Sequence, residues 1–152
     1  DMIVAGQAFH WFEPVATRAE FARILRPQGW VALIWNARRI QGTAFMRDYE
    51  ALLHQYSSEY KEVGHQRAEM DDGAIAAFFG QAGCKIVSLP NSQHFNAAGL
   101  QGRLLSSSYS PEPGHPDYAP MLDALHKLFD QHQVDGRVTF EYETKIYVGR
   151  LT

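Results

Sequence analysis

Two apolar runs separated by a helical pattern constrain the fold of this chain more than any other feature. Residues 2–5 read Met-Ile-Val-Ala, and residues 30–35 read Trp-Val-Ala-Leu-Ile-Trp. Such runs predict strands, and a continuous apolar run is typical of a strand buried on both faces of a parallel sheet. Between them, a helical pattern ends at Pro27 and Gly29. This part of the chain therefore predicts an α/β fold that starts with a strand, a helix and a second, parallel strand.

The remainder of the chain predicts four more helices and two more strands. We expect helices from Thr43 to about Tyr60, from Asp71 or Asp72 to Gly83, and over residues 96–109 and 118–133. Polar residues 57–70 predict a loop, and strands are expected at 84–89 and 138–149. The last strand alternates apolar and polar residues, so we expect one drier face that carries Val138, Phe140, Tyr142, Thr144, Ile146 and Val148.

Polar and aromatic side chains follow the first two predicted strands. Gln7, His10 and Trp11 come just after the first strand, and Asn36 ends the second. Gly6 is expected to let the backbone leave the sheet there. In an open α/β sheet, ligands bind at the carboxyl ends of the strands. The sequence therefore predicts that these side chains face one crevice.

The order of these segments carries a family resemblance. Residues 1–12 (DMIVAGQAFHWF), followed by Arg-Pro-Gln-Gly at 26–29 and by 32–36, resemble the fourth strand, next helix and fifth strand of class I S-adenosylmethionine-dependent methyltransferases of the type 11 group. Ser-Ser-Ser-Tyr at 106–109 and the closing residues 138–147 fit the same group. The resemblance implies a partial Rossmann-like three-layer α/β sandwich with a mostly parallel sheet. Its antiparallel C-terminal strand is expected between the strands at 30–35 and 84–89.

The resemblance also implies a place within the family's domain. The glycine-rich turn and the acidic residue that bind the cofactor in this family have no counterpart in the sequence. We therefore expect residues 1–152 to form a single domain, the C-terminal portion of a methyltransferase, with helical acceptor-side segments at 36–83 and 94–134. We expect this piece to be inactive alone. A non-catalytic, oligomerising module derived from the same fold is the alternative interpretation, and a nicotinamide-dependent oxidoreductase is a weaker third.

By the same resemblance, S-adenosylmethionine and a small-molecule methyl acceptor are the expected ligands. The expected cofactor contacts are Gln7, Ala8, Phe9, His10 and Trp11. The expected acceptor contacts are Trp11, Asn36, Ser108 and Tyr109. His10 is a candidate general base, because a neutral imidazole accepts protons near pH 7. The alternative is that His10 only packs against the turn.

Several other residue groups have simpler interpretations. The serines at 106–108 lack a Gly-x-Ser-x-Gly turn and indicate a hydroxyl cluster at a helix end rather than a nucleophile. Seven histidines show no ligand spacing, so we predict no metal site. His126 and His132 are expected on a solvated helix face. Arg38 and Arg39 are too few for a nucleic-acid patch and are expected to be exposed.

The composition of the chain and the open edge of its first predicted strand indicate which kinds of partner to expect. A formal net charge of -3 argues against nucleic acid as a partner. No apolar run reaches the roughly 20 residues that span a bilayer, so no membrane partner is expected. The single cysteine, Cys84, suits a reducing cytoplasm. An unpaired edge on the first strand predicts a homodimer or an exchange of elements between chains.

Overall fold

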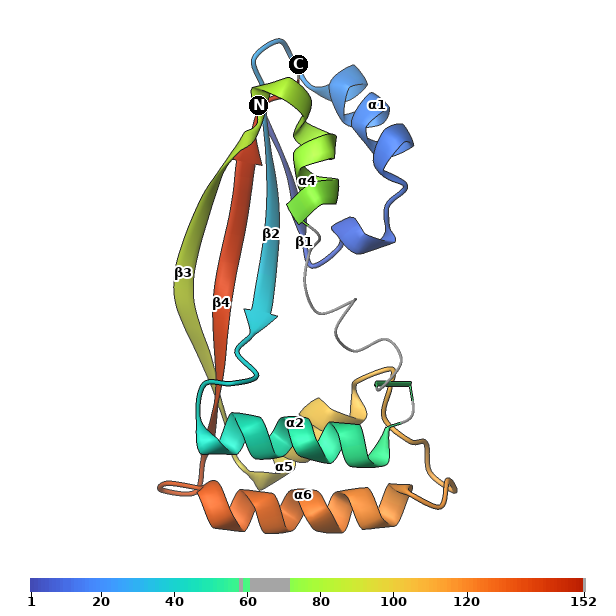
Figure 1. Cartoon of the computed structure of the whole chain (residues 1–152), viewed down its shortest axis with the longest axis vertical. Coiled ribbons are helices and arrows are strands. Elements are labelled where there is room, and N and C mark those ends of the chain that lie inside the picture. Colours follow the sequence, from blue (N-terminus) through green and yellow to red (C-terminus); the bar gives the residue numbers. More distant parts are fainter. Residues whose placement is uncertain (58, 61–71, 152) are drawn as a thin grey trace. The chain divides into compact units, whose positions relative to one another are not determined.

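The computed structural model describes residues 1–57, 59–60 and 72–151 (Figure 1). The chain forms two compact units. The first unit contains Asp1–Ala37, Arg67–Pro90 and Glu143–Thr152, and the second contains Arg38–Gln66 and Asn91–Tyr142. We describe each unit by itself. None of the described helices is both long and apolar enough to cross a membrane.

The helices and strands follow the order that the sequence predicts. The strands are β1 (Met2–Gly6), β2 (Trp30–Arg38), β3 (Cys84–Phe95) and β4 (Val138–Gly149). The α-helices are α1 (Pro14–Ile24), α2 (Ala44–Tyr56), α4 (Asp72–Phe79), α5 (Ala97–Leu105) and α6 (Tyr118–His132). Short 3-10 helices, η1 (Phe9–Trp11) and η2 (Gly80–Ala82), follow β1 and α4.

The four strands form one mixed sheet in the order β1-β2-β4-β3. β1 and β2 are parallel, with a register from Met2 opposite Trp30 to Gly6 opposite Ile34. Figure 1 shows β4 running in the opposite direction to β2. The predicted place of the C-terminal strand, between the second and third strands, is confirmed. β1 is an edge strand of this sheet.

Side-chain caps fix where three helices begin. The Glu13 carboxylate accepts hydrogen bonds from the backbone N–H groups of Val15 (3.1 Å) and Ala16 (2.6 Å) at the start of α1. Thr43 caps α2, and the Asn96 side chain caps α5 through the N–H of Gly99 at 2.8 Å. Each cap satisfies donors that the first helical turn leaves unpaired.

Each unit has its own hydrophobic core. In the first unit, side chains from β1, β2 and β4 pack with α4 and the η1 turn: Ala5, Phe9, Val31, Leu33, Ile75, Phe78, Phe79 and Tyr147. In the second, side chains of α2, α5 and α6 pack with the start of β4, and they include Tyr49, Leu53, Leu100, Leu104, Met121, Leu125 and Phe140. The aromatic residues Phe45, Tyr49, Phe78 and Phe79 are buried in these cores, whereas Tyr56 is only partly buried.

β3 differs from its predicted bounds. It runs to Phe95 rather than ending at residue 89, and it includes Pro90. β3 is an edge of the sheet, where proline is tolerated because one side of the strand has no ladder partner in the sheet. Its residues are mostly exposed, so the alternation that identifies a half-buried strand is missing.

β4 has the predicted bounds but not a single drier face. Val138, Phe140 and Tyr142 are buried in the core of the second unit. Further along the strand, Tyr147 is 2% exposed and belongs to the core of the first unit. Tyr147 is an odd number of positions from Val138, so the two side chains belong to opposite faces of the strand. The strand therefore buries one face in its first half and the other face in its second half.

Candidate functional site

The turn after β1 is held by an unusual backbone conformation. Gln7, rather than Gly6, takes the left-handed region, with a φ of 51°. Its backbone N–H donates to the carbonyl of Ile34 at 2.9 Å. Its side-chain Oε1 accepts a hydrogen bond from the backbone N–H of Asn36. A non-glycine residue in this region is costly and is often found at functional sites, where the surroundings hold it in place.

The structure brings Gln7 and Asn36 together, as expected for residues at the carboxyl ends of neighbouring parallel strands. The Asn36 side chain is in turn fixed by β4, because the Thr144 hydroxyl donates to Asn36 Oδ1 at 2.9 Å. Since the Gln7 oxygen is used by Asn36, the Gln7 amide nitrogen keeps two N–H donors that a ligand can use.

Of the predicted cofactor residues in the η1 turn, Phe9 is buried, whereas His10 and Trp11 are exposed. Phe9 is 6% exposed and packs edge-on against Phe78 on α4, with ring centroids 4.9 Å apart. Trp11 is 71% exposed. The exposed His10 ring lies 4.7 Å from the Trp11 ring and 4.9 Å from that of Trp35. Phe9 is therefore an anchor in the core, while His10 and Trp11 present an imidazole and an aromatic surface to solvent.

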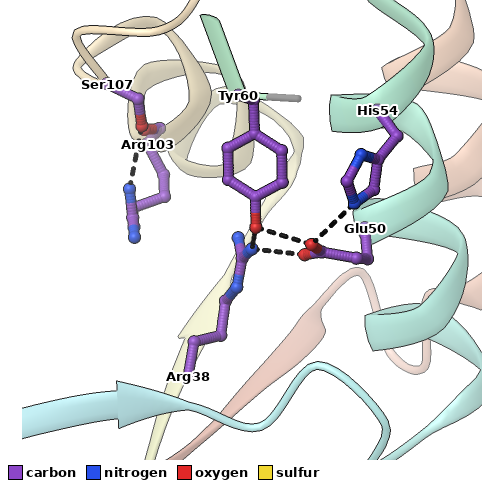
Figure 2. A network of polar contacts seen from close by, with 6 residues as sticks. All are labelled: Arg38, Glu50, His54, Tyr60, Arg103 and Ser107. Atoms are coloured by element: carbon purple, nitrogen blue, oxygen red, sulfur yellow. Dashed lines mark hydrogen bonds and ion pairs between the residues drawn. The ribbon is translucent and has the colours of Figure 1, made fainter. Parts of the chain in front are cut away.

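A second polar group lies in the second unit, where an arginine at the end of β2 meets a carboxylate on α2 (Figure 2). Arg38 Nη2 donates to Glu50 Oε2 at 2.5 Å and to the Tyr60 hydroxyl oxygen at 2.7 Å. Tyr60 donates its hydroxyl proton to Glu50 Oε1 at 2.6 Å. His54 Nε2 lies 3.4 Å from the same oxygen. The side chains of Arg38 and Glu50 are each 12% exposed, so this is a shielded, closed triangle of charge-assisted hydrogen bonds.

Burial also changes the acidity of two tyrosines in this unit. The pKa of Tyr60 is raised, first because burial disfavours the phenolate, although the Arg38 charge opposes this. Burial likewise raises the pKa of Tyr49. The Arg38 guanidinium lies over both rings, 5.3 Å from the Tyr49 centroid and 5.9 Å from that of Tyr60.

The two predicted acceptor residues of the Ser-rich segment belong to the second unit. Ser108 is exposed and lines a surface hollow of about 480 Å³. Tyr109 is half-buried, packs edge-on against Tyr60 at 4.9 Å and accepts a hydrogen bond on its carbonyl from Ser57 at 2.6 Å. Their role as acceptor contacts remains a prediction.

The hydroxyl cluster at the end of α5 is confirmed. Ser106 and Ser107 donate to the carbonyl of Arg103, and Ser110 donates to that of Leu104 at 2.6 Å. These hydroxyls satisfy carbonyls that the last helical turn leaves unpaired.

Two of the expectations for charged residues were wrong. Arg38 is not exposed, because it reaches Glu50 on α2. The His132 side chain is only 13% exposed and its Nε2 lies 2.7 Å from Asp48 Oδ2. Both partners are distant in sequence, so no local pattern could identify the pairs. Among the described residues, no group of three or more His, Cys, Asp or Glu side chains could hold a metal ion.

Sequence comparison matches one stretch of this chain to methyltransferases. Over 38 residues the chain is 47% identical to an uncharacterized methyltransferase of Schizosaccharomyces pombe and 45% identical to one of Mycobacterium bovis. The matched stretch is 25% of this chain and only 15% and 16% of those relatives. No family model matches the chain.

A solved structure described as a type II methyltransferase from Anaeromyxobacter dehalogenans superposes with a TM-score of 0.61 at 18% identity. The fold is a methyltransferase fold. The similarity covers 99% of this chain and 64% of the other chain. The methyltransferase fold accounts for the sheet order, in which the last strand lies between β2 and β3.

Proposed function

We propose that this chain is part of an S-adenosylmethionine-dependent methyltransferase of the type 11 group that acts on a small-molecule acceptor. The observation that carries the proposal is the turn after β1, where Gln7 and Asn36 lie at the carboxyl ends of two parallel strands. The matched relatives and the fold supply the reaction class.

The residues of the turn fit the methionine end of this cofactor. The Gln7 amide nitrogen offers donors to a carboxylate, and the exposed Trp11 ring offers an aromatic face. A sulfonium cation is attracted to such a face by the ring quadrupole. Gln7 and Trp11 would therefore hold the cofactor, while the buried Phe9 keeps the turn fixed to α4.

When bound, the cofactor supplies an electrophilic methyl group on a positively charged sulfur. The chain's own contribution is alignment of the acceptor and exclusion of water. We propose that His10 takes a proton from the acceptor oxygen or nitrogen on a ring nitrogen, because a neutral imidazole is a suitable general base near pH 7. The Trp11 and Trp35 rings limit how that imidazole can move.

A calorimetric titration with S-adenosylhomocysteine tests the proposal. We expect a saturable heat with the unaltered chain. In a second titration with S-adenosylmethionine, which unlike S-adenosylhomocysteine carries the sulfonium, Trp11→Ala should weaken binding about fivefold, since an exposed aromatic contact with a cation contributes about 1 kcal/mol. Trp30→Ala is the matched control, because Trp30 lies at the other end of β2 and is also exposed. The absence of heat at millimolar ligand would overturn the cofactor role of the turn.

The alternative candidate is an oligomerising module, which the exposure of β1 favours. Met2 and Val4 are each 56% exposed on this edge strand. An exposed apolar edge strand is a template for pairing with another chain. We propose that β1 pairs with a second copy of this chain or exchanges elements with it.

A further inference from the structure

Arg103, near the end of α5, is a half-buried cation without a counterion among the described residues. Its guanidinium donates to the Ser107 hydroxyl at 3.2 Å (Figure 2). It also lies over the Phe140 ring, 5.9 Å from the centroid. The Tyr142 side chain also interacts with this charge. All these partners are neutral, whereas a cation withdrawn from water is normally paired with an anion.

The carboxylate of Glu50 does not fill this role. Both Glu50 oxygens already accept hydrogen bonds, one from Arg38 and one from Tyr60. Arg38 therefore has a carboxylate partner, whereas Arg103 has none among the described residues. One positive charge is left without a compensating group among the described residues.

A buried hydroxyl beside this charge also lacks a partner. Tyr49 is 0% exposed, and its hydroxyl makes no hydrogen bond to any described residue. The Tyr49 ring packs edge-on against Phe140 at 4.8 Å, the same ring that carries Arg103. The charges of Arg38 and Arg103 both act on the Tyr49 hydroxyl. A buried polar group without a partner is uncommon in folded proteins and requires an explanation.

We propose that Arg103, with the Tyr49 hydroxyl near it, binds the carboxylate of a small carboxylic acid within the second unit. A guanidinium matches a carboxylate with two parallel hydrogen bonds, and the single uncompensated charge matches a monoanion. The rings of Tyr49, Phe140 and Tyr142 are buried, and apolar surroundings of this kind strengthen an ion pair. Phosphate, with a charge nearer to -2, matches this position less well.

The test compares two probes of nearly equal shape, propionate and propionamide. Each is titrated into the isotopically labelled chain without cofactor, at constant ionic strength, while the arginine Nε signals are followed by NMR. We expect propionate to shift the Arg103 signal saturably and propionamide not to do so. Arg103→Gln should weaken propionate binding about tenfold or more, because the bond involves a charged group. Arg47→Gln, an exposed arginine on α2, is the matched control and should leave binding unchanged.

Stability measurements separate a binding role from a structural one. If Arg103 lacks a counterion in the folded chain, Arg103→Gln should leave the urea midpoint nearly unchanged or raise it. Tyr49→Phe should also leave the midpoint unchanged, because it removes a buried hydroxyl that has no partner. The same Tyr49→Phe change should weaken propionate binding about threefold, the effect of a neutral hydrogen bond.

Several outcomes would overturn the inference. Equal binding of propionate and propionamide would do so, as would propionate binding that survives Arg103→Gln. Tighter Arg103-dependent binding of inorganic phosphate would show that the ligand class is wrong. A parallel titration with S-adenosylhomocysteine distinguishes the two proposals. If propionate binds through Arg103 but the cofactor analogue gives no heat, the proposed function fails while the anion site stands.

Discussion

Glu50 is the residue on which the polar group of the second unit depends. Its carboxylate accepts from Arg38 and Tyr60, and the side chain is 12% exposed. Glu50→Gln removes the negative charge and leaves the shielded Arg38 guanidinium without its counterion, although its hydrogen bond to Tyr60 can remain. We expect the free energy of unfolding to fall by about 3 kcal/mol, the usual cost of breaking a buried pair. Urea unfolding at pH 7 measures this change.

The ion pair of Glu20 with Arg23 on α1 is the matched control. The two side chains are 53% and 71% exposed, so solvent screens their interaction. The side-chain hydrogen bond with Arg23 lowers the pKa of Glu20, yet Glu20→Gln should change the urea midpoint little. Equal losses from the two substitutions would show that the Glu50 triangle is no stronger than a surface pair.

The buried tyrosines predict an alkaline limit to stability. Burial raises the pKa of both Tyr49 and Tyr60 above the usual value of 10.0. Above about pH 10 the unfolded chain loses these protons while the folded chain keeps them, so the free energy of unfolding must fall as pH rises. Urea unfolding measured between about pH 9 and pH 11 checks the slope, which the double change Tyr49→Phe with Tyr60→Phe should reduce. Tyr118→Phe, half-exposed on α6, should leave it unchanged.

Among the elements, the strands with a clear apolar pattern were the most predictable. Strands β1, β2 and β4 were predicted within a few residues, because each is a continuous or alternating apolar run. The second half of β3 was missed, since the exposed edge strand carries polar residues and Pro90. The helix expected from Thr43 to about Tyr60 ends at Tyr56, and the loop expected at 57–70 lies mostly outside the described residues.

The candidate site was predictable only in part, and for a related reason. Gln7 and Asn36 were found because each follows a predicted strand, and parallel strands place their carboxyl ends side by side. The group of Arg38, Glu50 and Tyr60 was missed because its members come from a strand end, a helix and a later segment. Only the packing of the second unit brings them together.

α5 gives a prediction at the scale of one element. The Asn96 side chain caps this helix by accepting from the Gly99 N–H at 2.8 Å, and the same helix carries Arg103 near its other end. Asn96→Ala leaves that donor unpaired and should lower the free energy of unfolding by about 1 kcal/mol. Asn96→Asp keeps the acceptor and should cost much less. Urea unfolding measures both, and equal losses would mean that the cap does not stabilise α5.

At the scale of the whole molecule, the sheet order leaves β1 at an edge. Backbone groups on the open side of β1 have no strand partner among the described residues, and Met2 and Val4 expose apolar surface beside them. A second chain that pairs with β1 would cover such an edge. The solved neighbour is longer than this chain, which covers 64% of it.

Sedimentation velocity at tens of micromolar decides whether the chain covers this edge with a copy of itself. We expect a dimer, because an exposed apolar edge strand is a template for pairing. Val4→Lys should shift the population to monomer, since the added charge opposes edge-to-edge pairing. Val15→Lys is the matched control, because Val15 is 77% exposed and lies on α1 rather than on β1. A monomeric profile for the unaltered chain, or equal effects of the two lysines, would mean that β1 is not the self-association surface.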